Sequence, residues 1–260
     1  METFGYIGAV CIGLILGLTG GGGSILTVPI LVYVMLLNPI TATAYSLFIV
    51  GTTSVFGALQ NYRKNLVDIK NGFLFAIPSF TAIYLTRRFI VPEIPAIIIE
   101  KPFLLLKSTF LMVFFAIIMI FAALSMLKKK KMNLGEPKVV SMPFLIIQTF
   151  IIGLVIGLVG AGGGFLIIPS LVLFANLPMK KAIGTSLFIM AMNSLIGFMG
   201  DVQNLDIDWV FLLSFTSLSV VGIFIGIYLN RFVNEAQLKK GFAYFVLVMA
   251  LFILYKEFIA

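Results

Sequence analysis

The sequence has no histidine and a single cysteine, Cys11, in 260 residues. A disulfide within the chain, a zinc site built from cysteine and histidine, and histidine acid/base catalysis are therefore excluded. Charge is also scarce, because Lys, Arg, Asp and Glu make up 11% of the chain, whereas a soluble domain has about 25%. The sequence also lacks an HExxH motif. We therefore expect no enzymatic activity, no cofactor and no metal site.

Apolar residues dominate what remains. The chain is 61% hydrophobic, with a mean hydropathy of +1.15, and runs such as 103–127 and 243–254 are about as long and apolar as spanning helices, which need about 20 such residues. The net charge of +8 comes from Lys and Arg in short connectors that form no continuous basic face, so it indicates membrane topology and no nucleic acid binding. The sequence predicts a multi-pass protein of the cell (plasma or inner) membrane, surrounded by the lipid bilayer.

The chain contains an internal repeat at an offset of 140 residues. The segment GLTGGGGSILTVP (17–29) aligns with GLVGAGGGFLIIP (157–169), with seven identities in thirteen positions, and the same register continues for about fifty residues. Shared apolar composition does not explain matches that include Gly, Pro, Ser and Asp. We predict an all-α membrane fold with a first repeat at 1–127, a cytoplasmic connector at 128–142 and a second repeat at 143–260.

Each repeat is predicted to hold four apolar segments. The opening segment of each is about 33 residues long and is interrupted by glycines. At about 1.5 Å per residue it is too long for one upright helix in a hydrocarbon core of about 30 Å, so we interpret it as two half-helices joined at a glycine break. The predicted segments are 5–37, 41–59, 71–90 and 103–127, followed by 143–175, 180–199, 208–229 and 238–258.

The basic residues indicate whether the second broken segment crosses the bilayer or returns to the side it entered. With the connector in the cytoplasm, a re-entrant hairpin places thirteen Lys and Arg inside and five outside, whereas a full crossing gives no bias. The first hairpin is predicted from its resemblance to the second. The resulting topology has six spans, two opposed hairpins, inverted repeats and both termini outside, an architecture typical of secondary transporters.

The glycine breaks are candidate anion sites. Each places exposed backbone amides and the positive end of a helix dipole deep in the protein, although glycines can also serve only to bring helices close together. Hydroxyl and amide side chains nearby can hold anion oxygens without a buried charge. The candidate binding residues are Gly20, Gly21, Gly22, Gly23, Ser24, Thr43, Tyr45, Ser46, Gly160, Ala161, Gly162, Gly163, Gly164, Thr185, Ser186 and Asn193. Ser46 and Ser186 are favoured because the repeat matches them.

Charged residues of the spans are expected near the membrane surfaces. Asp68 and Asp208 stand at predicted segment starts, where a carboxylate caps a helix N-terminus. Arg87 and Arg88 end a span and are expected to snorkel, although an arginine at a cavity mouth could also attract anions. Asp201 is likewise expected near a surface, so the sequence indicates no buried carboxylate for proton coupling.

The two glycine motifs, together with KKAIGTSLFIMAMNSLIG in the second repeat, resemble the TauE/SafE family of membrane permeases over nearly the whole chain. The resemblance implies a carrier of sulfite, organosulfonates or related small anions. It also implies that the site lies at Gly20–Pro29, Gly160–Pro169 and Gly184–Ser186. The first repeat departs from this pattern, with Ala44–Ser46 where the second has the GTS sequence, so the two sides of the site would differ.

We therefore expect a secondary transporter of a small anion, a sulfur-containing oxyanion or an organosulfonate, that alternates access at the two glycine breaks. An anion channel would use the same amides in a continuous pore. A non-transporting membrane assembly subunit would bind no small anion. The sequence leaves open which anion is carried, the direction, the coupling ion and the oligomeric state.

Overall fold

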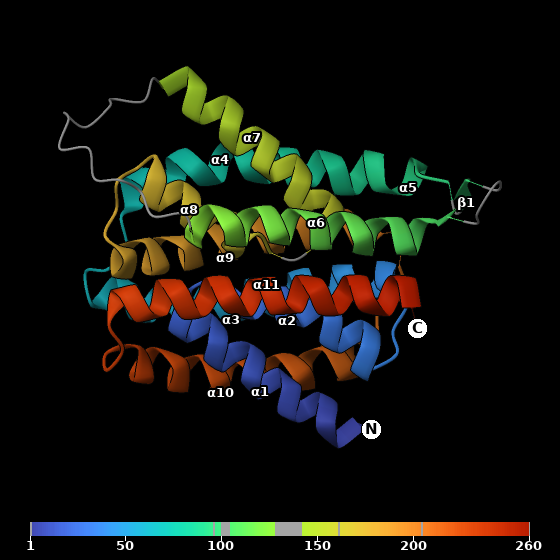
Figure 1. Ribbon diagram of the computed structural model, residues 1–260, viewed down its shortest axis with the longest axis horizontal. Coiled ribbons are helices and arrows are strands. Elements are labelled where there is room, and N and C mark those ends of the chain that lie inside the picture. Colours follow the sequence, from blue (N-terminus) through green and yellow to red (C-terminus); the bar gives the residue numbers. More distant parts are fainter. Residues whose placement is uncertain are drawn as a thin grey trace.

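The computed structural model describes residues 2–95, 97–99, 105–127, 142–160, 162–203 and 205–259. These residues form a bundle of helices in which α1 begins and α11 ends at the same end (Figure 1). The predicted connector lies outside the described residues except for Met142. The helices are α1 (Glu2–Thr19), α2 (Gly22–Pro29), η1 (Ile30–Val34), α3 (Pro39–Arg63), α4 (Ile69–Leu85), η2 (Thr86–Ile90), α5 (Val91–Glu93), α6 (Lys107–Leu127), α7 (Met142–Val159), α8 (Gly164–Leu173), α9 (Met179–Asp201), α10 (Trp209–Asn230) and α11 (Glu235–Ile259).

Five helices of the described chain are long and apolar enough to cross a membrane: Pro39–Arg63, Ile69–Glu93, Lys107–Ser125, Met179–Asp201 and Trp209–Asn230. Shorter apolar helices at Gly5–Thr19, Gly22–Val34 and Pro143–Val159 belong to the two broken segments. The sixth predicted span falls in α11, which has 25 residues. At about 1.5 Å per residue, α11 is longer than a hydrocarbon core of about 30 Å.

Apolar side chains cover much of the outside of the bundle, and small polar side chains lie within it. Phe121, Ile147 and Val210 are 69%, 61% and 82% exposed, whereas Ser46 and Asn193 are fully buried. A soluble protein shows the opposite tendency. This distribution fits a bundle whose surrounding solvent is lipid.

The first broken segment folds back on itself. A Cβ on Gly8 would lie 3.0 Å from the Ile30 side chain, and a Cβ on Gly23 would lie 2.7 Å from the Cβ of Leu16. Residues near the start of α1 therefore contact η1, and residues near its end contact α2. The two arms run antiparallel from the break at Gly20 and Gly21, as predicted for a glycine-broken helix pair.

The second broken segment has the same form. The rings of Phe144 and Phe174 lie 6.3 Å apart, so the beginning of α7 is close to the residue that follows α8. At the other end of the pair, Ile156 packs against Gly163. Both predicted helix breaks are thus present.

Each broken pair packs closely on a helix from the other predicted repeat. A Cβ on Gly13 of α1 would collide with the carbonyl oxygen of Ser219 in α10, and a Cβ on Gly153 of α7 would collide with the carbonyl oxygen of Ser79 in α4. The two contacts are related by the offset of 140 residues. These glycines serve close packing of helices, the alternative that the sequence analysis weighed for glycine in general.

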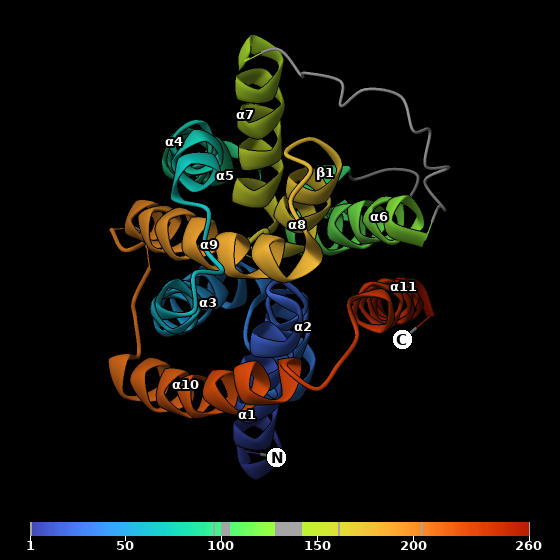
Figure 2. The same ribbon diagram turned by 90° about the vertical axis from the view of Figure 1, so that its left-hand side faces the viewer.

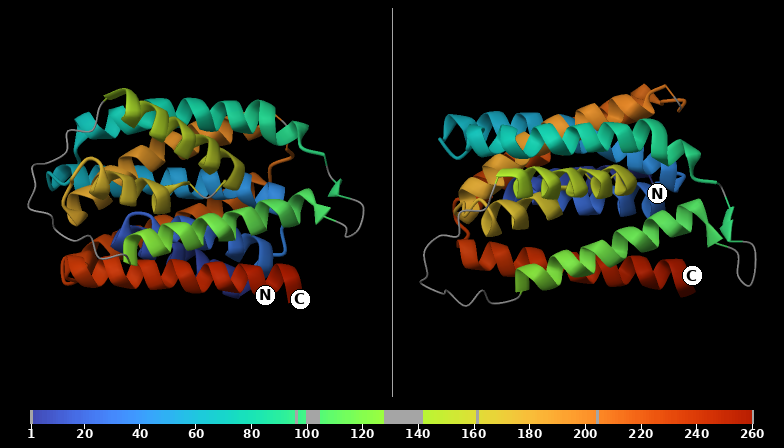
Figure 3. Two further views of the ribbon diagram at one scale, coloured as in Figure 1. Left: turned by 45° about the horizontal axis from the view of Figure 1, so that its top comes forward. Right: turned by 90° about the horizontal axis from the view of Figure 1, so that it is seen from above.

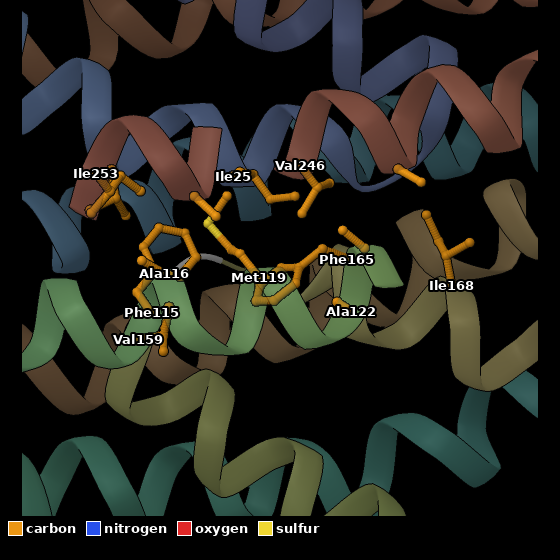
Figure 4. Packing of buried hydrophobic residues seen from close by; sticks show 14 of the residues in the cluster. Ile25, Phe115, Ala116, Met119, Ala122, Val159, Phe165, Ile168, Val246 and Ile253 are labelled. Atoms are coloured by element: carbon orange, nitrogen blue, oxygen red, sulfur yellow. The ribbon is translucent and has the colours of Figure 1, made fainter. Parts of the chain in front are cut away.

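Viewed end-on, α3 and α9 lie in the middle of the bundle, with the pair α4 and α7 on one side and the pair α1 and α10 on the opposite side (Figure 2). Helices α6 and α11 pack together at the flank. Their inner faces meet α2 and α8 in an apolar cluster that includes Ile25, Met119, Phe165, Val246 and Ile253 (Figure 4). This cluster supports the half-helices that follow both glycine breaks.

A short strand pair was not predicted. Strand β1 (Ile97–Ile99) pairs antiparallel with β2 (Leu105–Leu106) between α5 and α6. The pair projects from one end of the bundle (Figure 3). It lies at the opposite end of α6 from the predicted cytoplasmic connector.

Candidate functional site

The two glycine breaks touch each other inside the bundle. A Cβ on Gly21 would lie 2.6 Å from the carbonyl carbon of Gly164, so the backbones are in direct contact. Gly20 has φ +72° and Gly160 has φ +70°, and glycine adopts such left-handed backbone without the steric cost that other residues incur. The candidate residues at the two breaks are therefore brought together. Ala161 lies outside the described residues.

Hydroxyl groups satisfy much of the first break. Thr19 Oγ1 accepts a hydrogen bond from the Gly22 N–H at 2.9 Å, and Ser24 Oγ donates to the Gly21 carbonyl at 2.7 Å. Ser186 Oγ, from α9, donates to the Gly20 carbonyl at 3.0 Å. The first break is thus held by side chains from its own segment and from the opposite repeat.

The second break lacks these hydroxyls. At the offset of 140 residues, Val159 replaces Thr19 and Gly164 replaces Ser24. The break packs instead against Thr43 and Arg87, since a Cβ on Gly160 would collide with the Arg87 Nη2 atom and would lie close to the Thr43 side chain. The second break therefore has fewer hydroxyl partners of its own and a cation beside it.

Arg87 is buried, and the expectation that it snorkels to the surface was wrong. Its side chain is 1% exposed, and Nη1 donates to Asp201 Oδ2 and to Thr43 Oγ1, each at 3.2 Å. The described residues provide no hydrogen-bond partner for its Nε and Nη2 atoms. An ion pair offsets part of the cost of burying the guanidinium, which explains how an arginine can remain inside the bundle.

Asp201 is also buried, contrary to the expectation that it lies near a surface. It is the last residue of α9 and is 6% exposed. The corresponding residue of the first repeat is Asn61, and Ile227 corresponds to Arg87, so the repeat does not duplicate the ion pair. One signal was available in the sequence: Arg87 and Arg88 are adjacent, and neighbouring helical residues point about 100° apart. Both arginines could not face the same surface.

Further polar groups lie where α3 and α9 cross. Asn193 Oδ1 accepts from Ser79 Oγ at 3.0 Å, but its Nδ2 atom has no partner in the described chain. The same holds for the hydroxyls of Ser46, Ser54 and Ser194. An unsatisfied buried polar group costs about 1–3 kcal/mol, and such groups point to a functional requirement. Ser54 and Ser194, which the repeat matches, were not among the predicted site residues.

Ser194 connects this polar crossing to the second break. A Cβ on Gly162 would lie 3.1 Å from Ser194 Oγ. Gly162 has φ +64°. The hydroxyl of Ser194 is therefore close to the backbone of the break and is available to a group placed there.

Two other predicted site residues lie at helix ends. Tyr45 Oη accepts from the Asp208 N–H at 2.7 Å, and Thr185 Oγ1 accepts from the Asp68 N–H at 2.9 Å. The two aspartates cap α10 and α4, as predicted, by accepting from Phe211 and Asn71 N–H groups at 3.0 Å. Tyr45 and Thr185 thus perform one task in both repeats, although the sequences differ there.

The larger cavities of the described structure lie elsewhere. A cavity of about 550 Å³ between α3, α4 and α9 is lined by apolar side chains, including Leu59, Phe73 and Phe188. A second cavity, of about 290 Å³, lies between α6, α7 and α8. Neither is lined by a glycine of the breaks, which are packed tightly against their neighbours.

The comparisons with known proteins agree on one family. The family model described as "Sulfite exporter TauE/SafE" matches residues 6–253. The "probable membrane transporter protein YunE" of Bacillus subtilis is 26% identical over 243 residues, covering 87% of this chain and 89% of that protein. A "probable membrane transporter protein" of Xylella fastidiosa is 26% identical over 249 residues, covering 95% of this chain and 92% of that protein.

A third relative matches more strongly over a shorter stretch. A "probable membrane transporter protein" of Methanocaldococcus jannaschii is 35% identical over 117 residues, which are 43% of this chain and 44% of that protein. No solved protein structure matches this chain. The family match, which covers nearly the whole chain, agrees with the apolar helices and the paired glycine breaks. The chain is a multi-pass membrane protein that belongs to the TauE/SafE family of membrane transporters.

Proposed function

We propose that this protein is a secondary transporter of a small anion, either a sulfur-containing oxyanion or an organosulfonate. The observation that carries the proposal is the contact between the two glycine breaks, at Gly21 and Gly164. Buried donors without partners among the described residues lie close by, on Ser194 and Arg87. Broken helices that meet inside a bundle are the usual substrate site of secondary transporters.

The topology that we propose has inverted repeats. The two broken pairs enter the plasma membrane from opposite sides as re-entrant hairpins, and the five long helices together with α11 form six spans. Both chain termini then face outward, in agreement with the positions of the basic residues. The matched contacts of Gly13 with Ser219 and of Gly153 with Ser79 support a two-fold relation between the repeats.

Alternating access follows from the close packing of the breaks. Because Gly21 and Gly164 touch, an anion can enter only when one hairpin moves away from the other. Opening toward one side exposes one break while the other still seals the path. Each glycine break provides backbone that can change conformation at low steric cost.

The cargo class rests on donor chemistry and on the family. Backbone amides at helix starts, serine hydroxyls and a guanidinium all donate hydrogen bonds, which suits a ligand rich in oxygen acceptors. The matching family is described as sulfite exporters. Sulfite and sulfonates present three oxygens on one sulfur atom, and these can be held by donors from several directions.

An anion channel is the nearest alternative, and the contact between the breaks argues against it. A channel requires a continuous path, whereas Gly21 and Gly164 lie in van der Waals contact or closer. Recordings from a planar bilayer would distinguish the two, because a carrier turns over too slowly to give resolved single-channel openings.

The test is transport by the purified protein in proteoliposomes. We expect uptake of ³⁵S-labelled sulfite that saturates with concentration and that is accelerated by unlabelled sulfite on the opposite side. The Gly162→Val variant should insert normally and lose transport, since a Cβ there would lie 2.5 Å from Val50. Gly241→Val is the matched control, because a Cβ on Gly241 has no neighbour within 4 Å.

Sulfate, thiosulfate and sulfoacetate, with and without a pH gradient, would define the cargo and the coupling ion. If the wild-type protein moves none of these anions and binds none of them, a non-transporting assembly subunit becomes the better interpretation. Wild-type transport by Gly162→Val would remove the glycine break from the site.

A further inference from the structure

We propose that Arg87 is the residue that binds the transported anion, and that Asp201 competes with the anion for it. This inference rests on the proposed transport function and adds a cationic anchor that neither the glycine motifs nor the repeat predicted. It concerns the second break, because Arg87 lies against Gly160.

The guanidinium of Arg87 has donors to spare. Arginine carries five N–H donors in a rigid plane. The two on Nη1 are used by Asp201 and Thr43, each at 3.2 Å, and the described chain has no partner for those on Nε and Nη2. With the side chain 1% exposed, water does not satisfy these donors from the surface. A ligand at the break would.

The unused donors form one edge of the guanidinium. Nε and Nη2 point in the same direction, and this edge binds two oxygens of a carboxylate, phosphate or similar oxyanion through parallel hydrogen bonds. Nη2 is the atom that a Cβ on Gly160 would meet, so the edge faces the second glycine break. An anion there would contact both the guanidinium and the backbone of the break.

The ion pair with Asp201 is suited to exchange. It consists of one contact, from Nη1 to Oδ2, and Asp201 is the last residue of α9. An anion on the free edge would repel the carboxylate, since both would share one guanidinium in a medium of low dielectric. Asp201 therefore keeps Arg87 neutralised between cargoes, and the anion weakens its hold.

This arrangement makes the site one-sided. The first repeat has Ile227 and Asn61 at the positions that correspond to Arg87 and Asp201. The charged oxygens of the cargo thus lie at the second break. The remainder of an organosulfonate would extend toward the first break, where Ser186 and Gly20 lie.

The test uses four variants in proteoliposomes, with ³⁵S-labelled sulfite as the probe. The double variant Arg87→Gln/Asp201→Asn removes both charges, so it leaves no unpaired buried charge. We expect it to insert and elute as the wild type does, but to transport at least about 100-fold more slowly. Arg87→Lys keeps the charge without the bidentate edge and should raise KM by about tenfold.

Asp201→Asn separates a competing partner from a structural one. Removal of a competing carboxylate should lower KM for sulfite several-fold, whereas loss of a merely structural pair would not tighten binding. Arg88→Gln, at the adjacent position, is the matched control and should transport at the wild-type rate.

Transport within twofold of the wild type by the double variant would overturn this inference and leave the transporter proposal intact. If the double variant fails to insert, the other two decide: unchanged KM values in both Arg87→Lys and Asp201→Asn would also overturn it. A wild-type protein that moves no anion would instead contradict the proposed function.

Discussion

The two glycine breaks share a backbone but differ in their side chains. At the first, Thr19, Ser24 and Ser186 occupy backbone groups of the break. At the second, Val159 and Gly164 provide no such groups, and Arg87 lies alongside. The difference teaches that a duplicated motif need not do the same work twice: we interpret the first break as the more structural half and the second as the more receptive one.

The largest effect should come from a methyl group at each break. Gly160→Ala places a Cβ against Arg87 and Thr43 at φ +70°, and we expect transport to fall about 100-fold. Gly20→Ala carries a similar backbone strain of about 1–2 kcal/mol, at φ +72°, but does not displace Arg87. We expect a loss of about tenfold there. Initial rates of sulfite uptake, normalised to inserted protein, measure both, and equal losses would contradict the comparison.

Exchange of the hydroxyl between the breaks tests the comparison directly. Val159→Thr gives the second break the group that Thr19 gives the first, and this group would compete with the anion for a backbone N–H. We expect KM for sulfite to rise several-fold. Thr19→Val should instead lower thermal stability, because a buried N–H that loses its partner costs about 1–3 kcal/mol.

The corresponding measurements are transport kinetics for Val159→Thr and thermal unfolding in detergent for Thr19→Val. The comparison fails if the valine variant raises KM as much as the threonine variant does.

The matched serines should separate binding from stability. Ser186 Oγ donates to Gly20 O and Ile183 O, whereas the hydroxyl of Ser46 has no partner within the described residues. We expect Ser186→Ala to reduce the free energy of unfolding by about 1 kcal/mol. Ser46→Ala should leave stability nearly unchanged and raise KM about threefold. The reverse pattern in unfolding and uptake assays would show that Ser46 does not face the cargo.

The smallest effect on transport is expected at the helix caps. Tyr45→Phe and Thr185→Val each remove the acceptor of an aspartate N–H. Each should cost about 1 kcal/mol of stability and leave KM for sulfite within twofold of the wild type. A large rise of KM in either variant, at wild-type stability, would return that residue to the binding site.

The sequence analysis succeeded where the signal is local. Apolar length located the helices, glycine located the breaks at Gly20 and Gly160, and the caps at Asp68 and Asp208 follow from short-range preferences. The family resemblance is also visible in these local motifs.

Long-range pairing defeated the same analysis. The burial of Arg87 depends on Asp201, 114 residues away, and hydropathy alone assigns an arginine at a span end to the membrane interface. The same limit applies to the packing of α1 on α10. Only folding brings such residues together, and one sequence carries no local trace of it.

The packing of α1 on α10 and of α7 on α4 has a consequence for how the molecule can move. Gly13 and Gly153 bring backbone against backbone across the two repeats. A hairpin that swings open must carry with it the partner helix on which it lies. The rigid bodies of the transport cycle are then mixed groups, α1–α2 with α10 and α7–α8 with α4, and neither coincides with a half of the gene product.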